Sequence, residues 1–190
     1  MLNQRIKGLY GITPNKDLDI TLIENTIKKH KINILQYRRK TQDEKRKLDE
    51  STQLLKLCLE YNTLFIVNDD VNLCKKIGAN GVHLGQNDVD VHSARNQLGE
   101  KFIIGVSCHN SLKLAIEAEN SGANYIALGA IFKSASKPNA NNCSLSTIQN
   151  IKKHINIPIV GIGGITFENQ QSVLDAGCNS IAMIEGLFGH

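Results

Sequence analysis

Short apolar runs recur along the chain, and an amphipathic stretch follows each of them. Eight runs qualify as strands, at residues 6–13, 32–38, 64–69, 81–85, 102–107, 125–129, 157–164 and 180–185. They are rich in Val, Ile, Leu and Tyr and show no clean alternation of apolar and polar positions. This pattern indicates strands buried on both faces, as in a parallel sheet. Between them, residues such as Leu48, Leu55 and Leu59 recur at helical spacing.

Alternating strands and helices fit either a doubly wound open sheet or a closed barrel. A dinucleotide-binding sheet carries GxGxxG after its first strand, but the first turn here reads GITPNKD. A glycine cluster, GIGG at 161–164, instead follows the seventh strand, where barrels commonly bind phosphate. The pattern therefore favours an α/β fold of the (β/α)8 TIM-barrel type.

Length sharpens this prediction. The 190 residues are near the lower limit of about 200 for such a barrel, and no Pro- or Gly-rich linker divides them. We therefore expect residues 1–190 to form a single catalytic domain. The eighth strand should end near residue 184, which leaves only residues 185–190. The eighth helix should therefore be truncated or vestigial. The gap would leave an apolar strip between the first and seventh helices, which a homodimer partner could cover.

Composition narrows the function classes. The net charge is only +4, there is no Trp, and aromatic residues make up 5% of the chain, which argues against a nucleic-acid-binding platform. No apolar stretch approaches the ~20 residues of a membrane span, and the amino terminus lacks the pattern of a signal peptide. Five cysteines without CxxC spacing fit reduced thiols, so we expect a cytoplasmic protein.

Polar side chains collect where the predicted strands end, which is the functional edge of a barrel. The second strand ends in the segment QYRRK, residues 36–40. Side chains two apart on a strand point the same way, so Gln36, Arg38 and Lys40 share one direction and Tyr37 and Arg39 the other. Arg and Lys together suit a phosphate or pyrophosphate. The alternative is that they form inter-strand salt bridges.

Two carboxylates follow neighbouring strands, Asp69 after the third and Asp88 after the fourth. Mg²⁺ typically takes one or two carboxylates and completes its shell with water and phosphate oxygens, so the pair could hold this ion. The alternative is that either residue caps the next helix. Asp70 is expected to be solvated or a cap, and His83 to be a packed or supporting residue rather than a catalyst.

Two further segments have phosphate-binding character. Gly161, Gly163 and Gly164 would let backbone N–H groups approach a phosphate, with a following helix N-terminus adding to the attraction. Tight strand–helix packing is the other explanation. The long polar loop 132–143 is either a lid, with Ser134, Ser136 and Lys137 closing over a phosphate, or a surface loop.

Six segments together identify a resemblance. They are QYRRK (36–40), VND (67–69), GVHLGQND (81–88), IGVSCHN (104–110), YIALGAIFKSASK (125–137) and VGIGGI (160–165). In this order they resemble the thiamine-phosphate synthases, and the resemblance runs from residue 9 to the carboxyl terminus. It implies a TIM barrel that joins an aminopyrimidine diphosphate to a thiazole phosphate, giving thiamine phosphate and pyrophosphate.

The resemblance also implies roles for residues. It implies a Mg²⁺ cofactor on Asp69 and Asp88, and catalytic roles for Arg38, Lys40, Ser107 and Lys137. The pyrimidine diphosphate would lie on Gln36, Arg38, Lys40, Asn68, Ser107 and Lys137, and the thiazole phosphate on Ser134, Ser136 and Gly164. Tyr37, Arg39 and Ala135 complete the segments expected to line the substrates. The implied mechanism is dissociative, with pyrophosphate leaving before the thiazole nitrogen attacks.

The chain departs from the family pattern at several positions. Ser134 and Ser136 replace two Thr residues and keep both hydroxyls, whereas Ala130 replaces a Pro. Asp70 replaces an Arg beside the expected metal site. Glu185 stands where the family has a Ser that helps to hold the thiazole phosphate, and a carboxylate facing that phosphate would repel it.

Three alternative functions stay open. A thiazole tautomerase, a paralogue on the same barrel, typically lacks the metal-binding aspartates and uses a His at the position of Ala130. A non-catalytic binder of thiamine precursors is conceivable because of Glu185 and Asp70. Another phosphate-binding barrel, such as a sugar-phosphate epimerase or a lyase, is disfavoured by the QYRRK and GQND segments.

Overall fold

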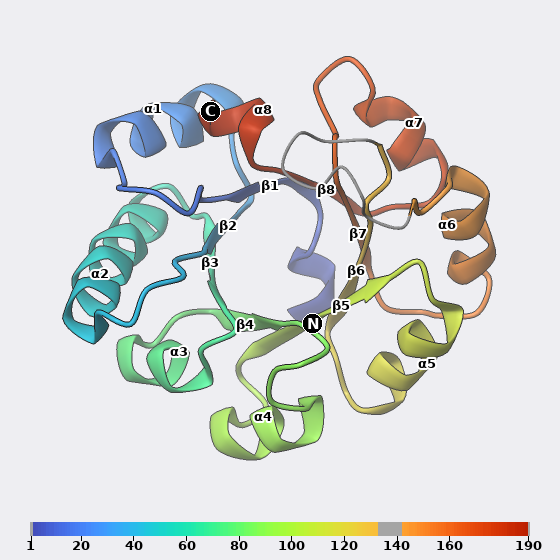
Figure 1. Cartoon of the computed structure of the whole chain (residues 1–190), viewed down its shortest axis with the longest axis horizontal. Coiled ribbons are helices and arrows are strands. Elements are labelled where there is room, and N and C mark those ends of the chain that lie inside the picture. Colours follow the sequence, from blue (N-terminus) through green and yellow to red (C-terminus); the bar gives the residue numbers. More distant parts are fainter. Residues whose placement is uncertain (1, 133–141, 190) are drawn as a thin grey trace.

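Eight parallel strands close into a barrel in the computed structural model, which describes residues 2–132 and 142–189 (Figure 1). The strands are β1 (Gly8–Ile12), β2 (Ile34–Tyr37), β3 (Leu64–Asn68), β4 (Gly81–Leu84), β5 (Ile103–His109), β6 (Tyr125–Leu128), β7 (Ile159–Ile162) and β8 (Ser180–Met183). They pair in chain order, and β1 pairs with both β2 and β8. The predicted barrel is thereby confirmed, and the open doubly wound sheet is wrong.

A helix follows each strand and packs outside the ring (Figure 1). The helices are α1 (Ile20–His30), α2 (Glu44–Glu60), α3 (Val71–Ile77), α4 (Val91–Leu98), α5 (Leu112–Asn120), α6 (Leu145–Lys152), α7 (Gln170–Asp175) and α8 (Glu185–Phe188). Side chains of Ser111 and Ser144 accept from the first turns of α5 and α6, as their positions predict. No described helix is long and apolar enough to cross a membrane.

Successive residues of each strand alternate between two separate apolar clusters. The inner cluster fills the barrel and includes Tyr10, Ile34, Ile66, Ile103, Tyr125 and Val160. The outer cluster joins the strands to the helices and includes Leu35, Phe65, Val82, Ile104, Ile126 and Ile159. Both faces are therefore buried, which explains why the sequence of each strand shows no polar alternation.

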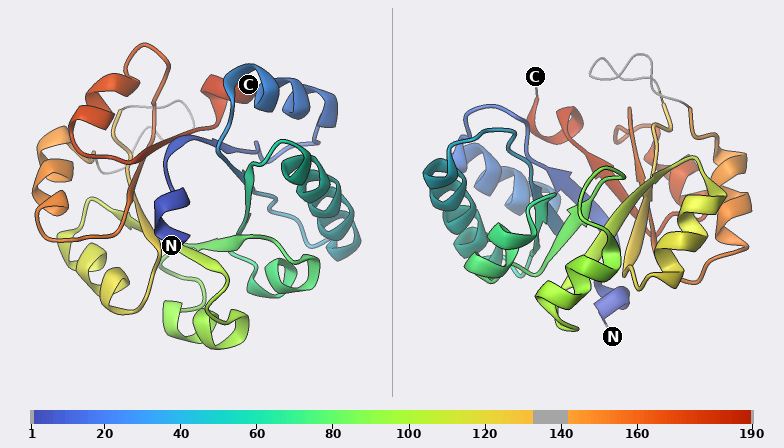
Figure 2. Two further views of the ribbon diagram at one scale, coloured as in Figure 1. Left: turned by 180° about the vertical axis from the view of Figure 1, so that it is seen from behind. Right: turned by 60° about the horizontal axis from the view of Figure 1, so that its bottom comes forward.

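The amino-terminal segment lies against the end of the barrel opposite the carboxyl ends of the strands. Its 3₁₀ turn, η1 (Leu2–Arg5), lies over the centre of the ring in Figure 1 and below the strands in the tilted view of Figure 2. Ile6, which follows the turn, is buried and belongs to the inner cluster. The barrel interior is thus closed at this end, so a ligand can reach it only from the carboxyl-terminal mouth.

A repeated asparagine joins the strands in pairs at that closed end. The residue immediately before each even-numbered strand is Asn33, Asn80, Asn124 or Asn179. Each Oδ1 accepts the backbone N–H of a residue in the preceding odd-numbered strand, at 2.7–3.0 Å; these residues are Leu9, Phe65, Ile104 and Ile159. Each asparagine also donates its own backbone N–H to the carbonyl of that same residue. The barrel therefore has a fourfold internal repeat, which is visible in the sequence as KINI, GANG, GANY and GCNS.

The last helix is short, as predicted. α8 has four residues, and its Leu187 and Phe188 are buried. Nearby, the His30 ring at the end of α1 stacks on the Phe167 ring of the β7–α7 loop, with centroids 4.8 Å apart. The apolar strip and the homodimer that would cover it both stay predictions.

Urea denaturation tests whether the asparagine repeat stabilises the barrel. In Asn80→Ala, the Phe65 N–H loses its side-chain acceptor, so the free energy of unfolding should fall by about 1–3 kcal/mol in urea denaturation. Asn96→Ala, at an exposed position of α4, is the matched control and should change it by less than about 0.5 kcal/mol. Equal losses in the two variants would show that the repeat does not stabilise the barrel.

Candidate active site

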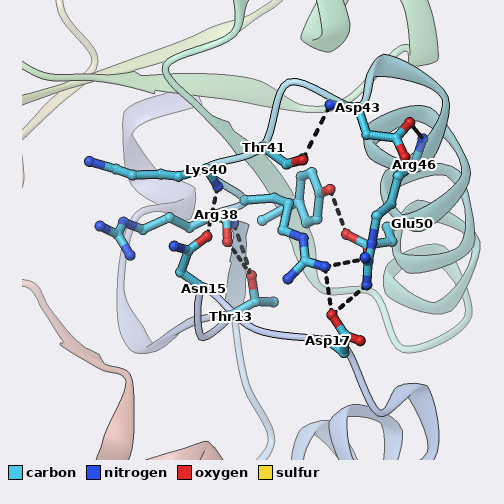
Figure 3. Close-up of polar contacts among 11 residues, drawn as sticks. Thr13, Asn15, Asp17, Arg38, Lys40, Thr41, Asp43, Arg46 and Glu50 are labelled. Atoms are coloured by element: carbon cyan, nitrogen blue, oxygen red, sulfur yellow. Dashed lines mark hydrogen bonds and ion pairs between the residues drawn. The ribbon is translucent and has the colours of Figure 1, made fainter.

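The loop after β1 fixes the backbone of the cationic segment that follows β2. Arg38 donates its backbone N–H to Thr13 Oγ1 at 2.9 Å, and Lys40 donates its own to Asn15 Oδ1 at 2.7 Å. Figure 3 shows the side chains of Arg38 and Lys40 extending together to the side away from α2. Neither forms an ion pair with any described residue. The backbone is held, and both cationic groups remain available to an anion.

Tyr37 and Arg39 form polar contacts with α2 and the β1–α1 loop. The Tyr37 hydroxyl donates to Glu50 of α2 at 2.8 Å. The Arg39 guanidinium donates to Asp17 at 2.9 Å and lies 3.4 Å from Glu50. Arg46 of α2 binds the same two carboxylates (Figure 3). Their polar groups attach α2 and the β1–α1 loop to the barrel, and substrate contact by these two residues stays a prediction.

Neither Asp69 nor Asp88 is a helix cap. The carboxylate that caps α3 is Asp70, which accepts the Leu73 N–H at 2.8 Å. The one that caps α4 is Asp90, which accepts the Ser93 N–H at 2.9 Å. The capping alternative is therefore wrong for the two residues expected to bind metal. In both loops a different aspartate serves the helix, so Asp69 and Asp88 are available for another role.

The Asp69 and Asp88 carboxylates interact at the mouth of the barrel. Asp69 has a left-handed backbone with φ 64°, which Asp tolerates better than most residues, and its N–H donates to the His83 carbonyl at 2.8 Å. Asp88 folds back so that its Oδ2 accepts the Gly85 N–H at 2.7 Å. A Cβ at Gly85 would lie 2.9 Å from that oxygen, so a larger residue there would displace the Asp88 carboxylate.

Electrostatics at this pair favour a bound cation. Burial and the neighbouring Asp88 carboxylate raise the pKa of Asp69 to about 6, although Lys40 and Asn68 oppose the rise. Two carboxylates that repel each other are a site where a divalent cation would relieve the repulsion. The described residues contain no group of three or more His, Cys, Asp or Glu side chains able to share a metal. The carboxylate pair itself fits Mg²⁺, because this ion needs only one or two carboxylates.

The Asp70 carboxylate, which stands where the resemblance predicts an arginine, forms an ion pair with a lysine of α2. Lys47 of α2 lies 3.0 Å from the Asp70 carboxylate, and the same lysine also pairs with Glu44. With its other oxygen capping α3, Asp70 is held by the helices around the barrel. The exchange of charge at this position thus adds an α2–α3 link and leaves the Asp69–Asp88 pair intact.

A bulge near the end of β5 places Ser107 inside the barrel. The pairing of β5 with β6 shifts between Ser107 and His109, so Cys108 is the extra residue. The Cys108 side chain is buried in the outer cluster, and burial raises the pKa of its thiol to about 12. It is not an activated nucleophile. Ser107 faces inward, and its Oγ lies 2.9 Å from His83 Nε2.

Hydrogen bonds across the barrel interior connect Ser107 with Gln36. Gln36 Nε2 donates to the Tyr10 hydroxyl at 2.9 Å, and that oxygen lies 2.8 Å from the Tyr125 hydroxyl. The Tyr125 hydroxyl in turn lies 3.0 Å from His83 Nδ1. Sequence reasoning placed Gln36 and Ser107 at the site and His83 near it, but it missed both tyrosines. The two are 115 residues apart, so no local pattern predicts their contact.

An open cleft of about 550 Å³ adjoins the cationic segment between β2 and β3. Its lining includes Tyr37, Arg39, Lys40, Asn68 and Asp69, but neither Arg38 nor Asp88. Asn68, the last residue of β3, hydrogen-bonds the Asp69 carboxylate. Of the residues predicted to bind the diphosphate, the cleft thus brings Lys40 and Asn68 beside Asp69, one of the two predicted to bind the metal.

The proposed thiazole side of the site is only partly described. Gly163 and Gly164 follow β7 with positive φ, and a Cβ at Gly163 would lie 2.6 Å from the Ala130 Cα. The Gly164 carbonyl accepts from Asn169 Nδ2 at 3.0 Å, and α7 begins only at Gln170. The helix expected to follow the glycines is thus α7, and residues 165–169 separate its first residue from Gly164. Ser134, Ala135, Ser136 and Lys137 lie outside the described residues, as does most of the expected lid.

Sequence comparison gives one family and several close relatives. A family model described as thiamine monophosphate synthase matches residues 9–187. The chain is 42% identical to the thiamine-phosphate synthase of Nitrosococcus oceani, covering 98% of this chain and 88% of the relative. It is 41% identical to the thiamine-phosphate synthase of Methylococcus capsulatus, covering 96% of this chain and 83% of the relative.

Solved structures with the same fold include a thiamine phosphate pyrophosphorylase from Pyrococcus furiosus. It is 30% identical, has a TM-score of 0.90, and the match covers 100% of this chain and 91% of that one. An N-acetylmannosamine-6-phosphate 2-epimerase from Clostridium perfringens is 13% identical with a TM-score of 0.72, over 98% and 90% of the two chains. This second likeness shows the barrel fold alone.

The repulsion between the two carboxylates has a test in stability. Protonated Asp69 favours the folded state, and this contribution is complete below the ordinary aspartate pKa of 3.8 and lost as pH rises through about 6. In EDTA at pH 7.5, Asp69→Asn should therefore melt at a higher temperature than the wild type, and the gap should shrink at pH 5. Asp49→Asn, at an exposed position of α2, is the control. A lower melting temperature for Asp69→Asn at pH 7.5 would contradict the assignment.

Proposed function

The chain belongs to the thiamine monophosphate synthase family, and we propose that the carboxyl-terminal mouth of its barrel is the active site of this transferase of thiamine biosynthesis. There an aminopyrimidine diphosphate would be joined to a thiazole phosphate, and pyrophosphate would be released. One observation carries the proposal. The Lys40 ammonium acts on the Asp69 carboxylate, which Asp88 repels, and the Arg38 side chain extends to the same side as Lys40 (Figure 3). Neither cation forms an ion pair within the described part of the chain. This arrangement suits a metal-bound diphosphate.

The cations have a defined role in the reaction. In a dissociative alkyl transfer, the bond from the pyrimidine methylene carbon to the diphosphate oxygen breaks first, and negative charge grows on the departing pyrophosphate. Arg38 and Lys40, whose backbone is fixed by Thr13 and Asn15, would stabilise that charge without reorganising. Lys137, outside the described residues, is proposed to join them. No protein nucleophile is needed, which fits the buried, unactivated Cys108.

Asp69 and Asp88 are proposed to hold Mg²⁺. When bound, the ion would neutralise charge on the diphosphate and help it to leave. The chain contributes a pair of oriented carboxylates. The left-handed backbone at Asp69 orients its side chain, and the hydrogen bond from the Gly85 N–H orients that of Asp88. Asn68, hydrogen-bonded to Asp69, is proposed to hold the metal ligand and to touch the diphosphate.

Gln36 and Ser107 are proposed to bind the pyrimidine ring. Both project into the barrel, one from β2 and one from β5, and both lie at the mouth end of their strands. The thiazole phosphate is assigned to Gly164 and to Ser134 and Ser136. Glu185, which begins α8, stands near the same rim, and its carboxylate would weaken binding of that phosphate if it faces the site.

The rival paralogue has less support. A thiazole tautomerase would need a His after β6, where Ala130 stands, and would not need the paired aspartates.

The described cysteines are all free thiols, which supports the proposal of a reducing, cytoplasmic setting. Residues 1–190 are proposed to act as one catalytic domain, and a homodimer is proposed on the sequence argument alone.

The direct test of the function is a turnover assay. Purified protein with both substrates and Mg²⁺ should form thiamine phosphate and pyrophosphate. Asp88→Asn should lower kcat at a fixed Mg²⁺ concentration by about 100-fold or more, because charge on the leaving group loses its counter-ion. Asp49→Asn should match the wild type. Absence of product from the wild-type protein would refute the synthase assignment, and normal turnover of Asp88→Asn would refute the metal site alone.

Two adjacent arginines provide a matched pair for the orientation of the β2 segment. Arg38→Gln should lower kcat/KM for the pyrimidine diphosphate by about 100-fold, since it removes a cation from the leaving group. Arg39→Gln should mainly lower the melting temperature, because Glu50 and Asp17 lose a partner. The measurements are steady-state kinetics and thermal unfolding of both variants. A larger kinetic defect in Arg39→Gln would show that the assigned directions are reversed.

A further inference from the structure

A line of polar groups crosses the apolar interior of the barrel. Tyr10 and Tyr125 are 1% and 0% exposed, and His83 is 8% exposed. Their rings also pack together: the Tyr10 and Tyr125 centroids lie 6.2 Å apart, and the His83 ring stacks on Tyr125 at 5.6 Å. A buried network of this kind costs free energy unless every donor and acceptor is used. Its hydrogen bonds can therefore be followed atom by atom.

With the Gln36 amide oriented as it is in this structure, counting hydrogens gives the network one direction. The Tyr10 oxygen accepts from Gln36 Nε2, so the single Tyr10 hydrogen must go to its other partner, Tyr125. The Tyr125 oxygen then accepts, and its own hydrogen goes to His83 Nδ1. If Tyr125 instead donated to Tyr10, the buried Tyr10 hydrogen would have no acceptor among the described residues. Such an unsatisfied group is strongly disfavoured.

The same count fixes the tautomer of His83. With Nδ1 accepting from Tyr125, a neutral imidazole carries its hydrogen on Nε2, which lies 2.9 Å from Ser107 Oγ. A second hydrogen on Nδ1 would face the hydrogen that Tyr125 donates, so the ring carries a hydrogen on Nε2 alone. Ser107 therefore accepts from His83, and its hydroxyl hydrogen is directed to a ligand. At the other end, the Gln36 amide makes its one hydrogen bond to a described residue through Nε2, which leaves Oε1 to accept from a ligand.

We propose that Tyr10, Tyr125 and His83 are positioning residues that fix the polarity of both ends of this network, a carbonyl oxygen at Gln36 and a hydroxyl donor at Ser107. The proposal rests on the proposed function, because the ligand of the network is the pyrimidine substrate of that reaction. A molecule that fits both ends offers an N–H group to Gln36 and a lone pair to Ser107. An aminopyrimidine does this with its amino group and a ring nitrogen.

The fixed polarity also favours the reaction itself. When the diphosphate leaves, positive charge on the pyrimidine is delocalised onto its amino group, whose N–H becomes a stronger donor. A carbonyl oxygen of Gln36 therefore binds the cationic form more tightly than the substrate. The opposite amide orientation would present N–H groups to that charge and repel it. With Nε2 bound to the Tyr10 hydroxyl, the amide keeps its oxygen available to that charge.

The backbone makes room for this arrangement. A Cβ at Gly105 of β5 would overlap the Tyr125 ring, so glycine is required where the tyrosine crosses the barrel. Gln86 Nε2 donates to the Ser107 carbonyl at 2.5 Å, which holds the bulge that carries the serine. Both features serve the network rather than the outer packing of the barrel.

The direction of the network can be read by NMR without any turnover. In wild-type protein labelled with ¹⁵N-histidine at pH 7, the His83 signals should show hydrogen-bearing Nε2 and non-protonated Nδ1. His83→Asn identifies those signals by their loss. Hydrogen on Nδ1, or on both nitrogens, would overturn the proposal. Because this reading needs no substrate, it stands apart from failure of the proposed function, which would appear as no product from the wild type.

Kinetics test the effect on catalysis. Tyr125→Phe keeps the ring but removes the donor to His83, and kcat should fall by about tenfold while KM for the thiazole phosphate stays unchanged. Tyr61→Phe, which removes a hydroxyl that donates to Glu24 outside the barrel, is the matched control and should retain wild-type kcat. A Tyr125→Phe variant that keeps wild-type kcat, or that changes KM for the thiazole phosphate instead, would overturn the positioning role.

Discussion

The closed ring of parallel strands is the constraint on which the site depends. Every strand is buried on both faces, so successive side chains must go alternately into the barrel and outward to the helices. At the mouth this alternation separates neighbours with similar chemistry: Arg38 from Arg39, and Ser107 from Cys108. One member of each pair faces the ligand side, and the other attaches a helix or fills the outer core.

The interior of the ring joins structure to chemistry. At the amino-terminal ends of the strands lie η1 and the asparagine repeat, which links the strands in pairs. Toward the mouth, a hydrogen-bond network runs from Gln36 to Ser107 through Tyr10, Tyr125 and His83. A closed barrel can hold hydrogen-bonding groups in one orientation, so the dissociating substrate of the proposed reaction would meet a preorganised environment.

The sequence predicts most of the architecture because burial and periodicity are local signals. The eight strands, the caps Ser111 and Ser144 and the short α8 follow from it. The roles of Tyr10 and Tyr125 do not, because their contact joins distant strands inside the ring. Alternation predicts that Tyr37 and Arg39 point away from Arg38 and Lys40, but their bonds to Glu50 and Asp17 need the folded structure. The asparagine repeat is visible in the sequence as GANG, GANY and GCNS, but its meaning needs the paired strands.

The central claim is that the segments following β2, β3 and β4 hold a metal-bound diphosphate at the mouth of the barrel. A crystal structure of the protein with Mg²⁺ and pyrophosphate tests it most directly. The account predicts pyrophosphate oxygens on Arg38 and Lys40, with the ion between the diphosphate and the carboxylates of Asp69 and Asp88. Pyrophosphate bound to Arg39 on the α2 side, or a metal away from both aspartates, would contradict it.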